Sequence, residues 1–182
     1  MQIITGKFAK RKLIAPKGDQ TRPTLGRVKE ALFSIIADRI AGATVLDLFA
    51  GSGAYAAECY SRGAKQVVLV DQSAEAKKAI ATNLRQMQYT LIDLPAEHAL
   101  NRLKNQHATF DIIFMDPPYD DAELATTTLR LISRFNLLNP NGIVVFETRD
   151  KNNLPKIPKS YIINDERTYG IAKILFLEQN NE

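Results

Sequence analysis

The chain of 182 residues has a single cysteine, Cys59, and only two histidines, His98 and His107, which lie apart in the sequence. A single cysteine excludes an internal disulfide bond, and so few ligand-type side chains lack the spacing of a zinc site. We therefore expect that neither a disulfide nor a metal stabilises this fold, and that the activity requires no metal.

Long apolar runs are also absent. No stretch approaches the ~18 apolar residues that a membrane-spanning helix needs, and the N-terminus lacks the apolar core of a secretory signal. Hydrophobic residues make up 45% and charged residues 24% of the chain, as in ordinary globular proteins. We expect a cytoplasmic protein of one domain, given the usual ~100 to 200 residues per domain, with no membrane partner.

Positive charge is concentrated at the start of the chain. The first 30 residues carry eight basic and two acidic side chains, a net charge of +6, whereas the other 152 residues sum to −2. A basic segment on a slightly acidic body favours a polyphosphate partner, because phosphate contacts release condensed counterions. A solvated tail is the alternative interpretation. The candidate nucleic-acid contacts are Lys7, Lys10, Arg11, Lys12, Arg22 and Arg27.

Five short apolar runs, rich in β-branched residues, alternate with helix-compatible stretches through the middle of the chain. The runs cover residues 44–49, 66–71, 89–94, 110–116 and 142–147, and the helical stretches cover 54–61, 74–87, 96–105 and 122–134. This alternation is typical of βαβ units. It predicts an α/β fold with a doubly wound, mostly parallel sheet.

The two ends of the chain depart from this alternation. Residues 2–16 resemble a short strand pair or an extended arm, and residues 23–41 show helical spacing. Residues 160–164 and 171–177 are strand-like, and the segment between them is too short for a helix, so we predict a C-terminal antiparallel hairpin. We divide the chain into a basic N-terminal arm or hairpin, 1–22, and a domain, 23–182.

A glycine-containing turn follows the first strand, at the edge where open α/β sheets bind ligands. Asp71 ends the next strand, 20 residues after Gly51, which is the spacing of an acid that binds ribose hydroxyls. A further acid, Asp47, would repel a pyrophosphate but attract the sulfonium and ammonium groups of S-adenosylmethionine. We predict this cofactor, with a dehydrogenase phosphate loop or a ligand-free turn as the alternative. The candidate cofactor contacts are Asp47, Phe49, Ala50, Gly51, Gly53, Asp71 and Gln72.

A second motif, Asp116-Pro117-Pro118-Tyr119, follows the fourth strand and is expected at the same edge. Two prolines remove two backbone donors and leave carbonyl acceptors. The Asp116 carboxylate and the Pro117 carbonyl can then accept the N–H groups of a nucleobase amine, while Tyr119 offers a stacking face. These four residues are the predicted catalytic set. A proline-stiffened structural loop is the alternative.

These motifs resemble those of a known enzyme class. The pattern Asp47-x-Phe49-x-Gly51-x-Gly53 is similar to motif I of class I methyltransferases, and the Asp116 motif is similar to motif IV of their amino-group branch. Further segments resemble the RsmD family of small-subunit ribosomal RNA guanine-N2 methyltransferases: Ile3-Ile4-x-Gly6-Lys7, Arg11-Lys12-Leu13, Arg22-Pro23-Thr24, residues 27–33, residues 61–64 and Arg167-x-Tyr169-Gly170.

The resemblance implies a Rossmann-like methyltransferase that uses S-adenosylmethionine and modifies the N2 amine of a guanine in small-subunit rRNA. The basic arm would contact the RNA, either naked or within an assembling 30S particle, and the enzyme would act as a monomer. Two other readings stay open: a DNA adenine-N6 methyltransferase, which shares the amine chemistry, and a non-catalytic RNA-binding assembly factor. Glu97 and His98 are alternative candidates for a residue near the adenine of the cofactor.

Overall fold

The computed structural model describes residues 1–16, 23–117, 121–149 and 154–180. The helices among these residues are α1 (Pro23–Ile35), a 3-10 turn (Ala37–Arg39), α2 (Ala54–Ser61), α3 (Ala74–Asn83), α4 (Ala96–Asn105) and α5 (Ala122–Arg134). The strands are β1 (Thr44–Leu48), β2 (Gln66–Val70), β3 (Thr90–Ile92), β4 (Phe110–Met115), β5 (Leu138–Thr148), β6 (Tyr161–Tyr169) and β7 (Ala172–Gln179).

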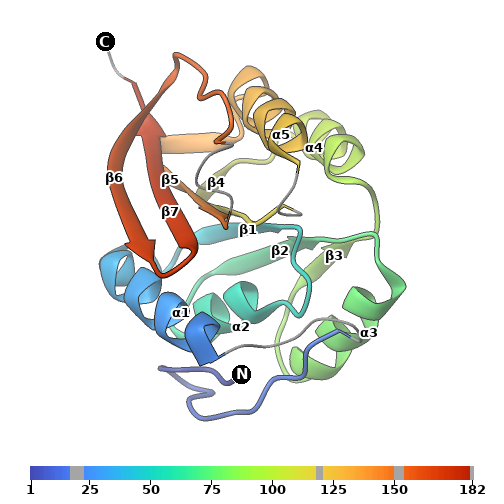
Figure 1. Ribbon diagram of the computed structural model, residues 1–182. Coiled ribbons are helices and arrows are strands. Elements are labelled where there is room, and N and C mark those ends of the chain that lie inside the picture. Colours follow the sequence, from blue (N-terminus) through green and yellow to red (C-terminus); the bar gives the residue numbers. More distant parts are fainter. Residues whose placement is uncertain (17–22, 118–120, 150–153, 181–182) are drawn as a thin grey trace.

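The strands form one mixed sheet in the order β3-β2-β1-β4-β5-β7-β6 (Figure 1). The first five strands pair in parallel, whereas β7 pairs antiparallel with both β5 and β6. The strand order reverses beside β1, so the loops after β1 and β4 diverge there and leave room for a ligand. The predicted α/β fold, mostly parallel with a C-terminal antiparallel hairpin, is confirmed.

Helices cover both faces of the sheet. On β1, Val45 packs into a core shared with α1, α2 and α3, whereas the neighbouring Leu46 and Leu48 pack into a second core with α4 and α5. This alternation follows from the two-residue period of a strand, which turns successive side chains to opposite faces. Both faces of the parallel part of the sheet are therefore buried, as the apolar strand sequences predict.

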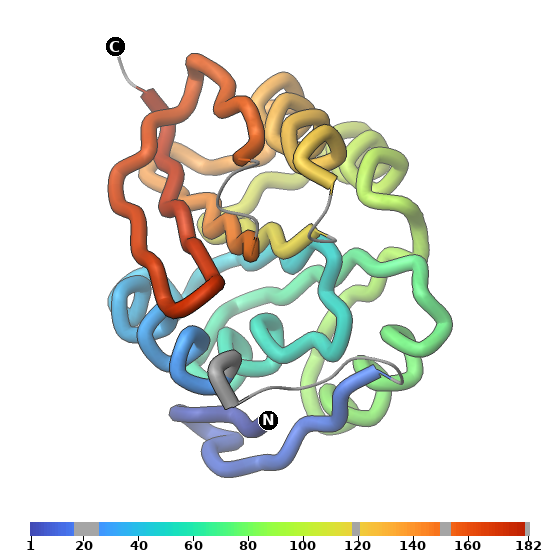
Figure 2. Tube along the Cα trace, in the orientation of Figure 1, coloured from blue at the N-terminus to red at the C-terminus, as the bar shows by residue number. Residues whose placement is uncertain are grey.

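The N-terminal segment, residues 1–16, lies along the side of the molecule formed by α1 to α3 (Figure 2). A single antiparallel bridge joins Gln2 to Lys12, and Ile3 and Leu13 are buried in the core. For these residues the alternative interpretation, a solvated tail, is therefore wrong. Gly6, at φ +89°, is required here, because a Cβ would meet the Ser61 carbonyl oxygen at 1.9 Å.

Several boundaries differ from the sequence prediction. The segment 165–170, predicted as a loop, belongs mostly to the hairpin, in which β6 extends to Tyr169. Its polar residues are accommodated because β6 is an edge strand with exposed side chains, and Lys173 pairs with Glu166 at 3.2 Å across the hairpin. The first helix ends at Ile35 and continues only as a 3-10 turn.

No helix in the described ranges is long and apolar enough to cross a membrane.

Candidate active site

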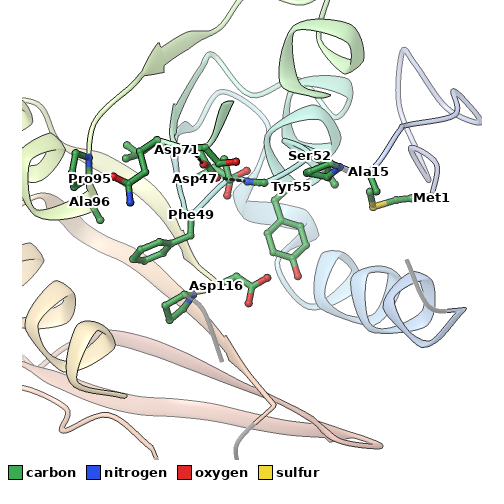
Figure 3. Close-up of a pocket in the computed structure, with 18 of the residues that line it drawn as sticks. Met1, Ala15, Asp47, Phe49, Ser52, Tyr55, Asp71, Pro95, Ala96 and Asp116 are labelled. Atoms are coloured by element: carbon green, nitrogen blue, oxygen red, sulfur yellow. Dashed lines mark hydrogen bonds between the residues drawn. The ribbon is translucent and has the colours of Figure 1, made fainter. Parts of the chain in front are cut away.

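The carboxyl edge of the parallel strands contains a cavity of about 480 Å³ (Figure 3). It lies where the loops after β1, β2, β3 and β4 converge next to the first turn of α2. The two motifs that the sequence places at this edge are therefore brought together. The predicted site residues that line the cavity are Asp47, Phe49, Ala50, Gly51, Asp71, Gln72, Asp116 and Pro117.

Asp71 joins the glycine turn to the end of β2. Its Oδ2 accepts the backbone N–H of Gly51 at 2.8 Å, and its Oδ1 accepts that of Ser73 at 2.8 Å. Ser73 in turn caps α3, since its hydroxyl accepts the Ala76 N–H. Both oxygens of Asp71 are thus held in place, and the remaining lone pairs can accept ribose hydroxyls.

Asp47 lies deeper in the site. Only 3% of it is exposed, and its Oδ2 accepts the backbone N–H of Ala56 at 3.1 Å in the first turn of α2. Burial, together with the nearby charge of Asp71, raises the pKa of Asp47 to about 8, although the hydrogen bond from Ala56 opposes the rise. A cation that binds beside this buried acid stabilises its ionised form, so the attraction between the two charges favours binding.

Gly53 does not line the cavity. It is the N-cap of α2 at φ +70°, and an added Cβ would lie 3.0 Å from Leu84 and 3.1 Å from Leu69. The absence of a side chain at Gly53 allows α2 to pack closely against α3 and the sheet. The structure therefore separates the two glycines of the motif, with Gly51 at the cavity and Gly53 in the packing beneath it.

The predicted catalytic motif, residues 116–119, lies only partly within the described residues. Asp116 is partly buried, Pro117 is buried, and both line the cavity on the side of β4. Pro118 and Tyr119 lie outside the described residues, so their expected roles stay predictions.

Sequence reasoning missed several residues of the cavity. Leu94, Pro95 and Ala96 line it after β3, whereas neither Glu97 nor His98, the candidates for the adenine, is among the lining residues. An apolar wall suits the flat face of a purine. The signal was available, because these three residues lie between the end of β3 and the start of α4, at the binding edge. The cavity is also lined by Met1, Ala15, Pro16, Lys29, Ser52, Ala54, Tyr55, Val70, Ser73 and Arg149.

Lys29 is not a free surface cation like its neighbours in the sequence. Its ammonium lies 3.0 Å from Glu58 and donates to the Gln2 carbonyl, and only 4% of the residue is exposed. Burial lowers the pKa of Lys29, although Glu58 opposes this. Glu58 also accepts the N–H groups of Ile4 and Thr5, which ties the N-terminal segment to α1 and α2.

The predicted nucleic-acid contacts lie mainly on the N-terminal segment. Lys7, Lys10 and Lys12 are exposed, and Arg11 is partly exposed. Lys7 and Arg11 lie over the ring of Phe8, at 5.6 Å and 5.7 Å from its centroid. Arg27, on α1, is also exposed, whereas Arg22 lies outside the described residues. In the part of the chain that the structure describes, no cluster of His, Cys, Asp or Glu could hold a metal ion.

These features define a class of protein. A doubly wound sheet with two acids and an apolar wall around one cavity at the switch point fits S-adenosylmethionine, whose cationic end, ribose and purine each find a matching group. The solved structure of yhhF from Escherichia coli superposes with a TM-score of 0.83 at 26% identity, covering 100% of this chain and 99% of that one. SMU.776, solved in complex with SAH, shares the fold with a TM-score of 0.63 at 17% identity over 82% of this chain and 48% of its own. The protein is a class I, S-adenosylmethionine-dependent methyltransferase.

The family follows from whole-chain similarity. The model of the family described as "Conserved hypothetical protein 95" matches residues 1–178. YlbH from Bacillus subtilis (strain 168) is 33% identical over 96% of both chains. Ribosomal RNA small subunit methyltransferase D from Escherichia coli (strain K12) is 30% identical, covering 93% of this chain and 85% of its own. The chain belongs to this family, the RsmD family.

Proposed function

We propose that this enzyme methylates the exocyclic N2 amine of a guanine in small-subunit ribosomal RNA. The proposed target is the guanine at position 966 of that RNA. One observation carries the proposal: the acids suited to the cofactor, Asp47 and Asp71, line the same cavity as Asp116, the acid suited to an amine. The names of the relatives support rRNA as the substrate. We further propose that the enzyme works as a cytoplasmic monomer on rRNA, either naked or within an assembling 30S particle.

When bound, S-adenosylmethionine supplies an electrophilic methyl group on sulfur. The role of Asp116 is to accept an N–H of the amine, beside the Pro117 carbonyl, so that the nitrogen lone pair faces the methyl group. This matters because the lone pair of an arylamine is delocalised into the ring. The Asp116 carboxylate can also take the proton that the amine loses as the new N–C bond forms.

The target base must leave its stack to reach the cavity, because its amine lies on the pairing edge. Tyr119 is proposed to stack on the extruded base. The exposed cations Lys7, Lys10 and Lys12 and the partly exposed Arg11 are proposed to hold the phosphate backbone, with Arg22 and Arg27 extending the contact. Their role is to position the RNA, whereas the cavity selects the base.

The test is methylation of rRNA or immature small subunits with labelled S-adenosylmethionine, followed by mass analysis of the labelled nucleoside. We expect N2-methylguanine from the wild-type enzyme. Asp116→Ala should lower the rate by about a hundredfold or more, while calorimetry should show nearly unchanged cofactor binding. Asp38→Ala, which changes an exposed acid of the 3-10 turn, is the matched control and should keep the wild-type rate.

The rival readings give other results in the same assay. N6-methyladenine, with DNA as the better substrate, would identify an adenine methyltransferase. Absence of both S-adenosylmethionine binding and methylation would favour the assembly factor. Equal rates for wild type and Asp116→Ala would refute the role of Asp116.

A further inference from the structure

The carboxyl end of β5 places a further acid next to the catalytic motif. Phe146 pairs with Met115, so Glu147 follows in register beside Asp116. Only 2% of Glu147 is exposed, and its Oε1 has no hydrogen-bond partner within the described residues. Burial raises the pKa of Glu147, while the hydrogen bond from Tyr55 and the charge of Arg149 oppose the rise. The methyl transfer proposed above gives this buried acid no part.

Tyr55 connects Glu147 to the cavity. Its hydroxyl donates to Glu147 Oε2, and its ring is held by Phe33 and Phe114, with centroids 5.9 Å and 4.9 Å away. Tyr55 lines the cavity together with Asp116, and Figure 3 shows its hydroxyl and the Asp116 carboxylate at the same part of it. Burial and the charges of Glu147 and Asp116 raise the pKa of Tyr55 well above its usual value, so the phenol keeps its proton.

A phenol whose only hydrogen is committed to Glu147 presents lone pairs to the cavity. Beside Asp116, it therefore forms a pair of adjacent acceptors. The pairing edge of guanine carries two adjacent donors, the ring N1–H and the N2 amine. In adenine, the ring nitrogen beside the N6 amine is an acceptor. With adenine in the site, its ring nitrogen and the Tyr55 oxygen would face each other as two acceptors. Neither would then have a hydrogen-bond partner in the closed site, which costs free energy.

We propose that Tyr55, oriented by Glu147, accepts the N1–H of the target guanine while Asp116 holds its amine, so that Tyr55 selects guanine over adenine. This inference rests on the proposed function. Tyr55 contacts the substrate, and Glu147 is a positioning residue that acts through it. The selectivity thus comes from α2 and β5, outside the two motifs.

The test uses synthetic RNA in which one of two bases stands at the target nucleotide, the nucleotide that the methylation assay identifies. Guanine and 2,6-diaminopurine carry the same 2-amine. Ring nitrogen N1, however, is a donor in guanine and an acceptor in diaminopurine. We expect the wild-type enzyme to favour guanine in kcat/KM, and Tyr55→Phe to lower this preference by about tenfold to a hundredfold. A merely structural role would lower both rates and leave their ratio unchanged.

Further variants separate the two residues. Glu147→Leu removes the acceptor, which frees the phenol hydrogen to turn into the cavity, and should lower the preference as Tyr55→Phe does. Glu147→Gln keeps an oxygen for Tyr55 and should restore most of the preference. Tyr60→Phe makes the same chemical change in the same helix, at a residue that does not line the cavity, and should leave the ratio unchanged.

The possible failures are distinguishable. If the wild-type enzyme forms no N2-methylguanine, the proposed function fails and this inference fails with it. If N2-methylguanine forms but Tyr55→Phe lowers the rates on guanine and diaminopurine equally, the proposed function stands. Only the inference that Tyr55 accepts the N1–H of guanine is then overturned. Weaker S-adenosylmethionine binding by Tyr55→Phe in calorimetry would assign Tyr55 to the cofactor and likewise overturn the inference.

Discussion

Gly51 donates its backbone N–H to the Asp71 carboxylate at 2.8 Å, which ties the turn after β1 to the end of β2. One acid thereby shapes the glycine turn and faces the cavity as well. Because its second oxygen accepts the Ser73 N–H, the carboxylate is held in place before any ligand arrives. Ordering the site on binding then costs little free energy.

The first prediction concerns this acid. Asp71→Asn should lower S-adenosylmethionine affinity by about tenfold or more, because an amide has one acceptor oxygen for the N–H groups of Gly51 and Ser73, and a charge-assisted bond to ribose is lost. Isothermal titration calorimetry measures the change. The matched control is Asp93→Asn, which alters an exposed acid after β3 that pairs with Lys77. Equal affinities for the two variants would argue against the role of Asp71.

The second prediction concerns stability and Asp47. A folded-state pKa of about 8, raised from 3.8, means that ionising this acid costs more in the folded than in the unfolded chain. The folded state is therefore progressively destabilised as the pH rises from the unfolded value toward the folded one. Without cofactor, Asp47→Asn should raise Tm by roughly 2 to 4 °C or more at neutral pH. Differential scanning calorimetry across pH tests this, and a gain that does not grow as the pH rises would count against it.

The same acid predicts how cofactor binding depends on pH. A cation in the cavity favours the ionised carboxylate, so affinity for S-adenosylmethionine should rise between about pH 6 and about pH 9, with release of a proton on binding. Calorimetry in buffers of different ionisation enthalpy measures that proton. In Asp47→Asn, affinity should be lower and its pH dependence largely lost. A flat profile in the wild-type enzyme would contradict this assignment.

A fourth prediction concerns the RNA. Replacing Lys7, Lys10 and Lys12 by alanine should weaken RNA binding and lower the slope of log affinity against log salt by about 2, if each contacts one phosphate of a single strand. Point changes are cleaner than truncation, because Ile3 and Leu13 of the same segment are buried in the core. The matched control replaces Lys104, Lys156 and Lys159, which are exposed elsewhere. An equal loss in both variants would show general electrostatics rather than a contact surface.

A fifth prediction tests how the N-terminal segment is held. Glu58 is fully buried and accepts bonds from Ile4, Thr5, Lys29 and Arg62. Although burial alone would raise its pKa, the bonds from Ile4, Lys29 and Arg62 lower it. Its stabilising contribution is therefore present above the unfolded pKa and lost as the pH falls through the folded pKa. Glu58→Ala should cost about 3 to 5 kcal/mol, since it leaves Lys29 buried without its carboxylate.

Urea denaturation measures this loss, with Glu75→Gln as control. Glu75 pairs with Lys78 on the surface, so its change should cost less than about 0.5 kcal/mol. Similar costs for the two variants would mean that Glu58 does not hold the segment in place.

Local signals account for what could be predicted. The bounds of α2, α4 and α5 agree with the sequence because Gly53, Pro95 and Asp121 mark their starts. The length of the hairpin could not be predicted, because the polar residues of β6 gain their partners only across the sheet. The glycine turn and Asp116 were found because strand ends converge at one edge. The pair of Tyr55 and Glu147 was not, since 92 positions separate them and only tertiary packing joins them.

The most direct test of this account is a crystal structure of the enzyme with S-adenosylmethionine bound. We expect the ribose on Asp71, the cationic end near Asp47, the purine against Leu94 to Ala96, and the methyl group facing the space between Asp116 and Tyr55. A cofactor bound elsewhere, or with its methyl group turned away from Asp116, would contradict the claim that one cavity joins methyl donor and amine.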